Sequence, residues 1–596
     1  MTGLQSEEKS EGLNIKTQDN NMAKNSNHKK DNFLLQASIL AAAGLISRVI
    51  GLLYRSPLTA VIGDLGMGYY QAAYAIYTIV LLISSYSIPS AISKVIAQKL
   101  AVREYRNAHR IFTCSVWYVL VVGGIASLFL FFGAGFLVDG ASIPVLRVFA
   151  PTIFLYGLLG VLRGYFQAHK SMVQTSISQI LEQIANAVVS IGAACVLISL
   201  FMGTLDAPGL PDHLTSSRAA YGAALGAAGL QLNSLKSSRA MYGAAGSALG
   251  TGAGVLIGLL FMWGVYVLNK RMIRRRIDRD QTRRVDSYNE ISRTIMAVVT
   301  PFILSTAAYN LSTAVNSTVY LKLYRNVRGL DEATAYANYG VFSNKAVTIS
   351  NIPVAFASAM ASAMIPSVAQ LVAKKDLEGA RRKIGMAIKS TMIIAIPCAV
   401  GLFVLARPVT WLLYPQAATI DMAVKLLMAL SVSVIFFSLS TLSSSILQGI
   451  GRVNTPIYNA VAALFVQTAV VIGMLLLTDM DVYALVIANV VYSGLMCILN
   501  QISVRKAIGY RQELVKSFLV PFLASAVMGG AAWVVYQGLY ILTSSTVISV
   551  VPAILLAAII YFVLLILLKG MSQQELMALP KGYLLVKAAK ACGIMR

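Results

Sequence analysis

The chain has 596 residues, of which 57% are hydrophobic and 12% charged, and its formal net charge at pH 7 is +25. Apolar runs of about twenty residues recur along nearly its whole length, which leaves no room for a large soluble domain. These features indicate an all-α protein that crosses a membrane many times. The basic residues lie mainly between the apolar runs, where anionic lipids and membrane topology explain them better than nucleic acid does.

Residues 1–31 are polar and carry both signs of charge, which predicts a disordered cytoplasmic tail rather than a cleaved signal peptide. The apolar runs that follow predict fourteen transmembrane helices. Their expected ranges are 34–60, 68–93, 111–136, 143–166, 174–202, 241–268, 294–320, 336–370, 384–405, 420–448, 456–477, 482–503, 515–538 and 545–569.

The distribution of lysine and arginine predicts the orientation of these helices. With the N-terminus inside, the cytoplasmic connections carry 26 of these residues and the outer connections carry 7. This bias follows the positive-inside rule and places both termini in the cytoplasm.

The most basic connection divides the chain into two halves. The predicted organisation is a tail over 1–31, a six-helix lobe over 32–268 with an outer insertion at 203–240, a basic linker over 269–293, a second six-helix lobe over 294–503, and two further helices with a cytoplasmic tail over 504–596. The linker itself is expected to be solvated and close to anionic lipid.

A weak internal repeat supports this division. Residues 96–112 and 368–384 share five identities in seventeen positions, six spans apart on the same side of the membrane. The halves are therefore expected to be parallel repeats, with the substrate at their interface around a central cavity. In the outer insertion, 216–224 recurs almost unchanged as 237–245, and we find no function for this duplication. Glycines at 246, 250 and 254 predict a close helix-packing face.

The first apolar run, 34–63, carries two arginines at membrane depth. Gly44, Arg48, Gly51 and Arg55 are spaced so that they share one helical face. A guanidinium group at that depth costs several kcal/mol unless a partner or a wet cavity receives it. This face therefore predicts an anion-binding wall inside the protein.

Further polar side chains interrupt the apolar runs and extend this predicted site. Two more cations, Lys94 and Lys345, are candidates to bind the same anion. Buried cations outnumber buried acids, so pairing within the chain would leave positive charge for an anionic ligand. The candidates for a supporting polar surface are Ser47, Glu182, Gln183, Asn186, Asn310 and Asn344.

Several of these candidates also have a purely structural interpretation. Glu182 could pair with Arg48 or with Arg163 inside the protein. Lys94 could extend to the inner headgroups and Arg55 to the outer ones.

Enzymatic chemistry is not expected. The sequence has no G-x-x-x-x-G-K-[ST] loop, no nucleophile elbow and no H-E-x-x-H motif, so we assign no catalytic residue, metal ligand or cofactor. Asp64, Asp139, Asp479 and Asp481 fall in short outer turns, where solvated side chains are expected. A membrane-embedded enzyme stays an alternative, which would show turnover of a lipid-linked sugar without transport.

Short motifs along the chain resemble the multidrug/oligosaccharidyl-lipid/polysaccharide (MOP) exporter superfamily. Within it, the chain is most similar to the MurJ, SpoVB and YtgP group of bacterial polysaccharide-biosynthesis flippases. The likeness covers 33 to about 570. It is carried by S-R-V-I-G at 47–51 with Arg55 behind it, Y-S-I-P-S at 86–90, L-R-G-Y-F-Q at 162–167, S-N-K at 343–345, A-M-I-P-S at 363–367 and L-Q-G-I-G-R at 447–452.

The resemblance implies a fold and a substrate. It implies two six-helix lobes around a V-shaped cavity, two C-terminal helices with a lipid-facing groove, and export of lipid II, an undecaprenyl-diphosphate-linked peptidoglycan precursor. The family's cavity cations fall on Arg48, Arg55 and Lys345. A further family arginine falls at or beside Ser93, with Lys94 as the nearest cation. Lysine binds a phosphate group as a point charge, whereas arginine can donate two parallel hydrogen bonds to it.

The implied partners follow from this class of protein. They are a lipid-linked oligosaccharide and anionic membrane lipids, with no nucleic acid. The implied location is the bacterial cytoplasmic membrane, with the membrane potential or a coupling cation as the driving force and no cofactor. A monomer is compatible with the sequence, and the oligomeric state is left open. The alternatives are an exporter of another undecaprenyl-linked oligosaccharide, of O-unit or teichoic type, and a cation-coupled multidrug exporter, which the excess of cavity cations disfavours.

Overall fold

The computed structural model describes residues 43–44, 46–86, 88–169, 171–202, 218–280, 282, 285–328, 331–568 and 570. The predicted N-terminal tail and the start of the first span lie outside these residues. Every regular element in the described part of the chain is helical, as the apolar runs predict.

The described helices follow the predicted order. Residues 46–53 are helical and lead into α2. The elements are α2 (Arg55–Leu81), η1 (Leu82–Tyr86), α3 (Ile88–Ala101), α4 (Tyr105–Leu137), α5 (Ser142–Ala168), α6 (Met172–Met202), α7 (Arg218–Asp278), α8 (Tyr288–Arg328), α9 (Glu332–Gly340), η2 (Val341–Val347), α10 (Thr348–Ala373), α11 (Leu377–Val404), α12 (Ala406–Leu413), η3 (Ala417–Thr419), α13 (Ile420–Gly449), α14 (Thr455–Leu477), α15 (Tyr483–Ile508), η4 (Val515–Leu519), α16 (Val520–Thr543) and α17 (Thr546–Leu567).

Eleven helices in the described residues are long and apolar enough to cross a membrane, and they correspond to eleven of the fourteen predicted spans. The predicted spans without such a counterpart are 34–60, 294–320 and 336–370. The first lies partly outside the described residues, and the other two coincide with α8 and with α9, η2 and α10, which are helical. The membrane-spanning, all-helical class is confirmed, while the number fourteen stays a prediction.

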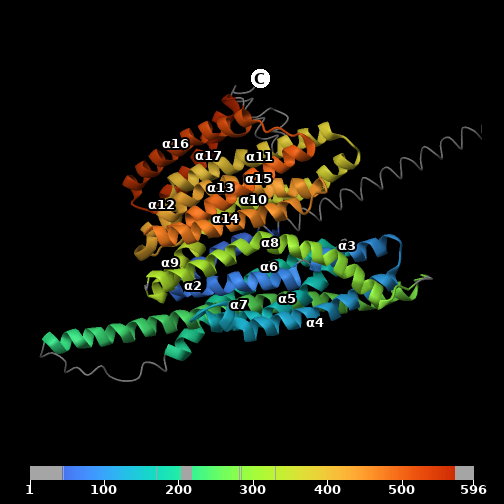
Figure 1. Cartoon of the computed structure of the whole chain (residues 1–596), viewed down its shortest axis with the longest axis horizontal. Helices are drawn as coiled ribbons and strands as arrows, with labels where there is room; N and C mark the ends of the chain where they lie inside the picture. Colours follow the sequence, from blue (N-terminus) through green and yellow to red (C-terminus); the bar gives the residue numbers. More distant parts are fainter. Residues whose placement is uncertain are drawn as a thin grey trace, which may run out of the picture.

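The helices form two groups (Figure 1). We call α2–α7 the first lobe and α9–α17, with η2, the second lobe. The helix α8 runs along the boundary and packs against both α2 and α14. The start of α7, which contains part of the outer insertion, extends past the ends of the neighbouring helices (Figure 1).

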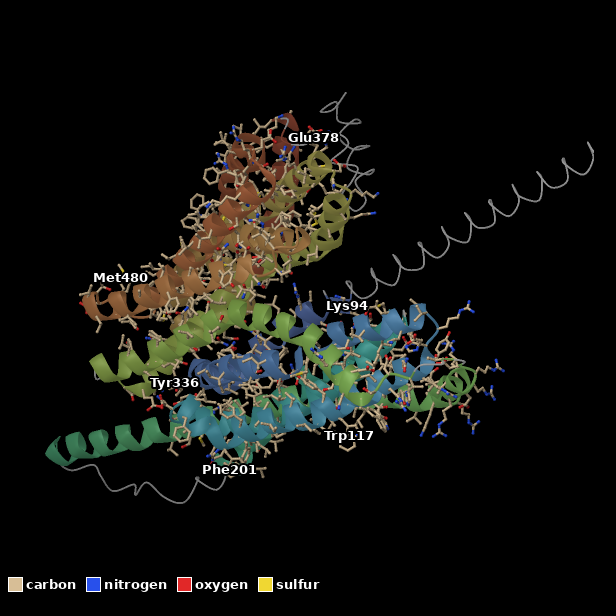
Figure 2. All side chains as sticks on the ribbon, turned by 45° about the vertical axis from the view of Figure 1, so that its right-hand side comes forward. Lys94, Trp117, Phe201, Tyr336, Glu378 and Met480 are labelled. Carbon is tan, nitrogen blue, oxygen red and sulfur yellow. The ribbon has the colours of Figure 1, made fainter. Side chains whose placement is uncertain are left out.

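Among the described residues, the lobes share an apolar core at one end. The largest apolar cluster contains buried side chains of both lobes, such as Phe149 in α5 and Leu426 in α13. Two other clusters belong separately to the first lobe with its adjoining α8 and to the second lobe. Figure 2 shows the lobes converging toward the end that carries Tyr336 and Met480 and diverging toward the other end.

We call these two ends the closed end and the basic end. The closed end carries the α4–α5 and α14–α15 connections, and there the Tyr336 hydroxyl of α9 donates a hydrogen bond of 3.1 Å to the Asp139 carbonyl oxygen. The basic end carries the α3–α4, α7–α8 and α10–α11 connections. The apolar core and this bond join the two lobes at the closed end.

The predicted glycine packing face on α7 is confirmed. A Cβ atom on Gly250 would lie 2.1 Å from the Ser190 hydroxyl oxygen, and one on Gly246 would lie 2.6 Å from the Ala193 carbonyl oxygen. A Cβ on Gly254 would likewise lie 2.5 Å from a carbonyl oxygen of α6. Only glycine permits this close approach of α6 and α7.

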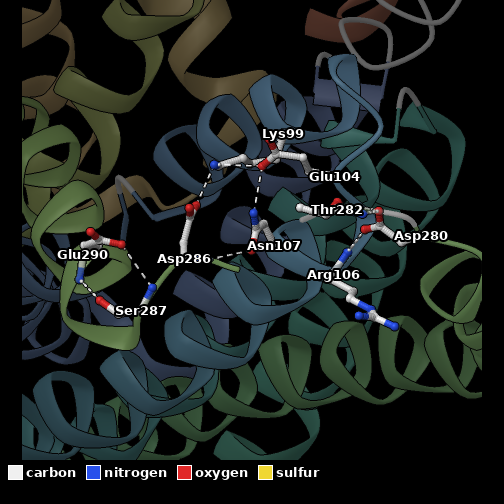
Figure 3. A network of polar contacts seen from close by, with 9 residues as sticks. All are labelled: Lys99, Glu104, Arg106, Asn107, Asp280, Thr282, Asp286, Ser287 and Glu290. Atoms are coloured by element: carbon white, nitrogen blue, oxygen red, sulfur yellow. Dashed lines mark hydrogen bonds and ion pairs between the residues drawn. The ribbon is translucent and has the colours of Figure 1, made fainter. Parts of the chain in front are cut away.

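The end of the basic linker is bound to the first lobe rather than solvated (Figure 3). Lys99 Nζ lies 2.9 Å from a Glu104 carboxylate oxygen and 2.5 Å from an Asp286 carboxylate oxygen. The Asn107 side chain donates to Glu104 and accepts from the Asp286 backbone N–H. Hydrogen bonds from Asn107 and Lys99 hold the pKa of Glu104 below its usual range.

A second contact fixes the same linker a few residues earlier (Figure 3). The Arg106 backbone N–H donates a bond of 2.6 Å to the Asp280 carboxylate, which also accepts from Thr282. Burial opposes ionisation of Asp280, but these hydrogen bonds outweigh it and lower its pKa. Because the pKa of Asp280 is lowered, its contribution to linker binding is present at neutral pH and is lost as the pH falls below about 4.

We expect Asp286→Ala to release the linker, because it removes one of the two carboxylates that neutralise Lys99. Amide hydrogen exchange across 279–287 should accelerate several-fold, since exchange tracks local opening. Asp278→Ala is the matched control: Asp278 is exposed at the end of α7 and makes none of these contacts. Equal exchange in the two variants would contradict a linker held by these ion pairs.

Candidate functional site

The candidate site is built where α2 of the first lobe lies against η2 and α10 of the second. In η2, which carries the S-N-K motif, the backbone makes a π-helical turn over Val341–Val347. Such turns insert a residue into a helix and often occur at functional sites. Both Asn344 and Lys345 are buried in this turn, with exposed fractions of 0% and 1%.

Three side chains of the described residues, Arg55, Asn344 and Lys345, make contacts that join the lobes along this boundary, and we call these contacts the polar seam. Arg55 Nη1 donates a hydrogen bond of 2.6 Å to the Thr348 hydroxyl. The Asn344 amide donates one of 2.9 Å to the Thr59 hydroxyl. The third contact is an ion pair between Lys345 and Asp64. The seam connects positions that lie about 280 to 290 residues apart in the chain.

The ion pair is the charged part of the seam. Lys345 Nζ lies 2.8 Å and 3.0 Å from the two carboxylate oxygens of Asp64 and donates a bond of 2.7 Å to the Thr419 hydroxyl. Thr419 also donates to the same carboxylate, at 2.6 Å. The Asp64 side chain is 14% exposed. A buried ammonium group requires such pairing, because its desolvation is otherwise not compensated.

This pairing corrects two predictions from the sequence. Lys345 is not an unpaired cation waiting for a ligand in this conformation, since Asp64 neutralises it. Asp64 is not a solvated turn residue. It directly follows Gly63, whose backbone angles (φ 72°, ψ 173°) break α2 in a conformation that glycine adopts readily. The predicted turn therefore exists, but it is packed against the second lobe.

The other predicted cations are placed differently. Arg55 is half-buried and held by Thr348, whereas Arg48, two turns earlier in the chain, is exposed. Lys94 is exposed in α3, and Figure 2 shows it on the edge of the first lobe that faces the second. Ser47 beside Arg48 is half-buried. The structure thus separates the cations of the closed end, which are engaged, from Arg48 and Lys94, whose side chains are exposed.

Glu182 has the internal partner that the sequence offered as an alternative. Its carboxylate lies 2.8 Å from Arg163 Nη2 of α5, and Arg163 Nε donates a bond of 2.8 Å to the Ser178 hydroxyl. Arg163 itself was not predicted as a site residue. In this conformation Glu182 is therefore part of an ion pair within the first lobe and is not an isolated carboxylate.

The remaining predicted polar residues lie on two helices: Gln183 and Asn186 belong to α6, and Asn310 belongs to α8. Gln183 lies next to the first span, because a Cβ on Gly51 would be 3.7 Å from its amide oxygen. Asn186 is buried at the α6–α7 contact, where it accepts a bond of 2.9 Å from the Ser190 hydroxyl. Asn310 belongs to α8, but its side chain lies outside the described residues.

Sequence reasoning missed the residues that complete the seam, namely Thr59, Asp64, Thr348 and Thr419. A signal for Asp64 was present, because it is an acid within the glycine-rich stretch G-D-L-G-M-G at 63–68 that joins two apolar runs. The three threonines had no such signal, since isolated threonines are common in membrane helices and loops.

Comparison with solved structures shows which fold this is. The chain is similar to a structure titled lipid II flippase MurJ, inward closed conformation, with a TM-score of 0.58 and 14% identity over 88% of this chain and 97% of that one. It is also similar to an outward-facing multidrug resistance MATE transporter of the MOP superfamily, with a TM-score of 0.53 and 16% identity over 80% and 95%. The two-lobed helical fold is therefore that of the MOP transporters.

The family assignment is more specific. The family model described as lipid II flippase MurJ matches residues 108–555, and the chain belongs to this family. Among curated relatives, it is 22% identical to the lipid II flippase MurJ of Bacillus subtilis over 83% of this chain and 87% of the relative. It is also 22% identical to stage V sporulation protein B of the same organism, over 92% and 98%.

Membership has direct consequences for the class of activity. Proteins of this family are transporters and not catalysts, and no cofactor is indicated for them. The chain is accordingly a multi-pass protein of the bacterial inner membrane, and the family supports a flippase for a lipid-linked precursor.

Proposed function

We propose that this protein moves lipid II, an undecaprenyl-diphosphate-linked peptidoglycan precursor, from the inner to the outer leaflet by alternating access. The family model and the curated relative of that name support this substrate. The observation that carries the mechanism is that Arg48 is exposed while the cations nearer the closed end, Arg55 and Lys345, are engaged in the seam between the lobes.

The proposed orientation places the basic end in the cytoplasm, in agreement with the excess of lysine and arginine there. The conformation described above is then inward-facing, with the lobes joined on the outer side. The proposed central cavity lies between the diverging lobes. The diphosphate enters it from the inner leaflet and binds Arg48, with Lys94 near the entrance.

In the proposed transport step, the seam opens and its cations change partners. Arg55 separates from Thr348 and Lys345 separates from Asp64. Both cations then donate charge-assisted hydrogen bonds to the diphosphate oxygens. The lobes then close at the basic end. Moving two negative charges outward through a full potential of about 100 mV would release roughly 4–5 kcal/mol. A coupling cation is the second proposed source of energy, and Glu182 would be its ligand once released from Arg163.

The test is lipid II flipping by purified variants in proteoliposomes. Arg48→Ala should lower the flipping rate by roughly tenfold to a hundredfold, because one charge-assisted contact to the diphosphate is lost. Membrane insertion and elution of the purified protein should not change. Arg382→Ala is the matched control, since Arg382 is an exposed arginine at the basic end of α11. Wild-type flipping by the Arg48 variant would refute its role.

Another undecaprenyl-linked oligosaccharide is the second candidate substrate. The identity to the sporulation protein equals that to the MurJ relative, at 22%. Both substrates carry the same diphosphate, so the proposed cations serve either one. Depleting the protein in its host and identifying the lipid-linked precursor that accumulates on the cytoplasmic side would distinguish them.

A further inference from the structure

A cavity separate from the polar seam lies at the basic end of the first lobe. It has a volume of about 210 Å³ and is bounded by the ends of α4, α5, α6 and α7. Aromatic rings of Tyr105, Tyr165 and Phe166 form part of its wall. Its strongly polar lining consists of His109, His169, Ser171, Gln174, Asn269 and Arg276.

The lining offers hydrogen-bond donors and one permanent positive charge. None of the described residues that line the cavity is an aspartate or a glutamate, and Arg276 is an exposed arginine in the last turn of α7. The Ser171 hydroxyl donates to the Gln174 amide oxygen. The NH2 group of Gln174 is therefore the part of this side chain that can donate to a ligand. These groups suit an anion with several oxygen atoms.

The two histidines add to this polar surface. His109 Nδ1 is buried and has no hydrogen-bond partner within the described part of the chain. The His169 Nδ1 atom is 2.9 Å from the Tyr165 carbonyl oxygen, to which it donates, and this bond fixes the orientation of the ring. In the tautomer that carries its proton on Nδ1, His109 would donate a hydrogen bond from this atom to a ligand oxygen.

An apolar surface runs from the mouth of the cavity along α6 and α7. Val173 and Ile177 are one turn apart on α6 and are both 41% exposed. Leu268 and Met272, one turn apart on α7, are 84% and 46% exposed. Met272 also lines the cavity. Such a surface next to a polar cavity fits acyl chains next to a headgroup.

We propose that this cavity binds the phosphate group of an anionic phospholipid, with the acyl chains along the exposed apolar surface of α6 and α7. Arg276 is the principal contact to the phosphate oxygens, and the amide of Gln174 and the His109 ring are donors beside it. The absence of a lining carboxylate disfavours headgroups that carry an ammonium group. The site lies within the first lobe and is independent of the transported substrate.

Lipid binding by the detergent-purified full-length protein tests this site. Native mass spectrometry gives the dissociation constants for phosphatidylglycerol and phosphatidylcholine, and Arg276→Gln is compared with Arg275→Gln. Both arginines are exposed in the last turn of α7, but only Arg276 lines the cavity. We expect Arg276→Gln to weaken phosphatidylglycerol binding about tenfold, as for the loss of one charge-assisted hydrogen bond. Arg275→Gln should weaken it less than twofold.

Three outcomes would overturn the proposal. Equal weakening by the two variants would show attraction to diffuse surface charge, and equal affinity for both lipids would exclude headgroup selection. Displacement of phosphatidylglycerol by an equal concentration of inorganic phosphate would show that a soluble phosphate is the ligand instead. If Arg276→Gln does not fold, Gln174→Leu tests the same site, with the same tenfold weakening expected and wild-type affinity as the contrary result.

Discussion

Alanine at Gly68 or Gly340 is expected to prevent the lobes from joining at the closed end. A Cβ on Gly68 of α2 would lie 1.9 Å from the Tyr336 carbonyl oxygen of α9, and one on Gly340 would lie 2.1 Å from the Asp64 carbonyl oxygen. Both obstacles are backbone atoms, which cannot turn aside as a side chain can. The two helices cross here at a distance that only glycine permits.

The consequence is a shift in conformational population. Because the variants exclude the state described here and not the opposite state, they should favour a form closed at the basic end. Spin labels at Val102 and Glu378, both exposed at the basic end of different lobes, would then move closer together. Double electron–electron resonance in a cysteine-free background measures this distance, and lipid II flipping should fall with it.

Gly401→Ala is the control for these variants. Gly401 lies within α11 of the second lobe, and a Cβ there would meet no atom within 4 Å. The substitution has the same effect on backbone entropy, but it places nothing between the lobes. An unchanged distance distribution in both the Gly68 and Gly340 variants would contradict a closed end that depends on their contact.

Removing the carboxylate of Asp64 is expected to destabilise the protein strongly. Asp64→Asn leaves the Lys345 ammonium group, which is 1% exposed, without its counter-charge. Breaking a buried ion pair from one side typically costs about 3–5 kcal/mol. Lys345→Met should cost less, because the Asp64 carboxylate it leaves behind is 14% exposed and has better access to water. SDS-induced unfolding of the purified variants measures these differences.

The double variant separates the effect of the ion pair on stability from its effect on transport. Asp64→Leu with Lys345→Met should recover most of the lost stability, since two apolar side chains of similar size replace the pair. Flipping should nevertheless stay low if Lys345 binds the diphosphate after the seam opens, as proposed. The control is Asp421→Asn, because the ion pair of Asp421 with Arg407 is about 70% exposed on both sides and contributes little. Wild-type stability of Asp64→Asn would contradict the argument.

The spans and their order could be predicted from sequence because hydropathy is a local property. A helix must be long and apolar enough to cross the membrane, and eleven of the predicted ranges meet that requirement in the described residues. The glycine face of α7 was visible for the same reason, since its spacing by four residues is a property of one helix.

The partners of the charged groups could not be predicted in this way. The sequence offered Glu182 two arginines and gave no reason to choose, and the structure pairs it with Arg163 of the neighbouring helix. It offered Lys345 no partner, because Asp64 lies 281 residues away in a segment that the sequence predicts to be a solvated turn. Only the packing of the lobes brings these two groups together.

The sequence by itself thus determined that this is a polytopic helical membrane protein with more cations than acids at membrane depth. The tertiary structure decided which of those cations are neutralised and which stay exposed. The physical reason is that insertion depends on the composition of each segment alone, whereas the pairing of a buried charge depends on which segments meet. Here the first and second lobes meet at Gly68 and Gly340, Lys345 is buried against Asp64 between them, and Arg48 is exposed.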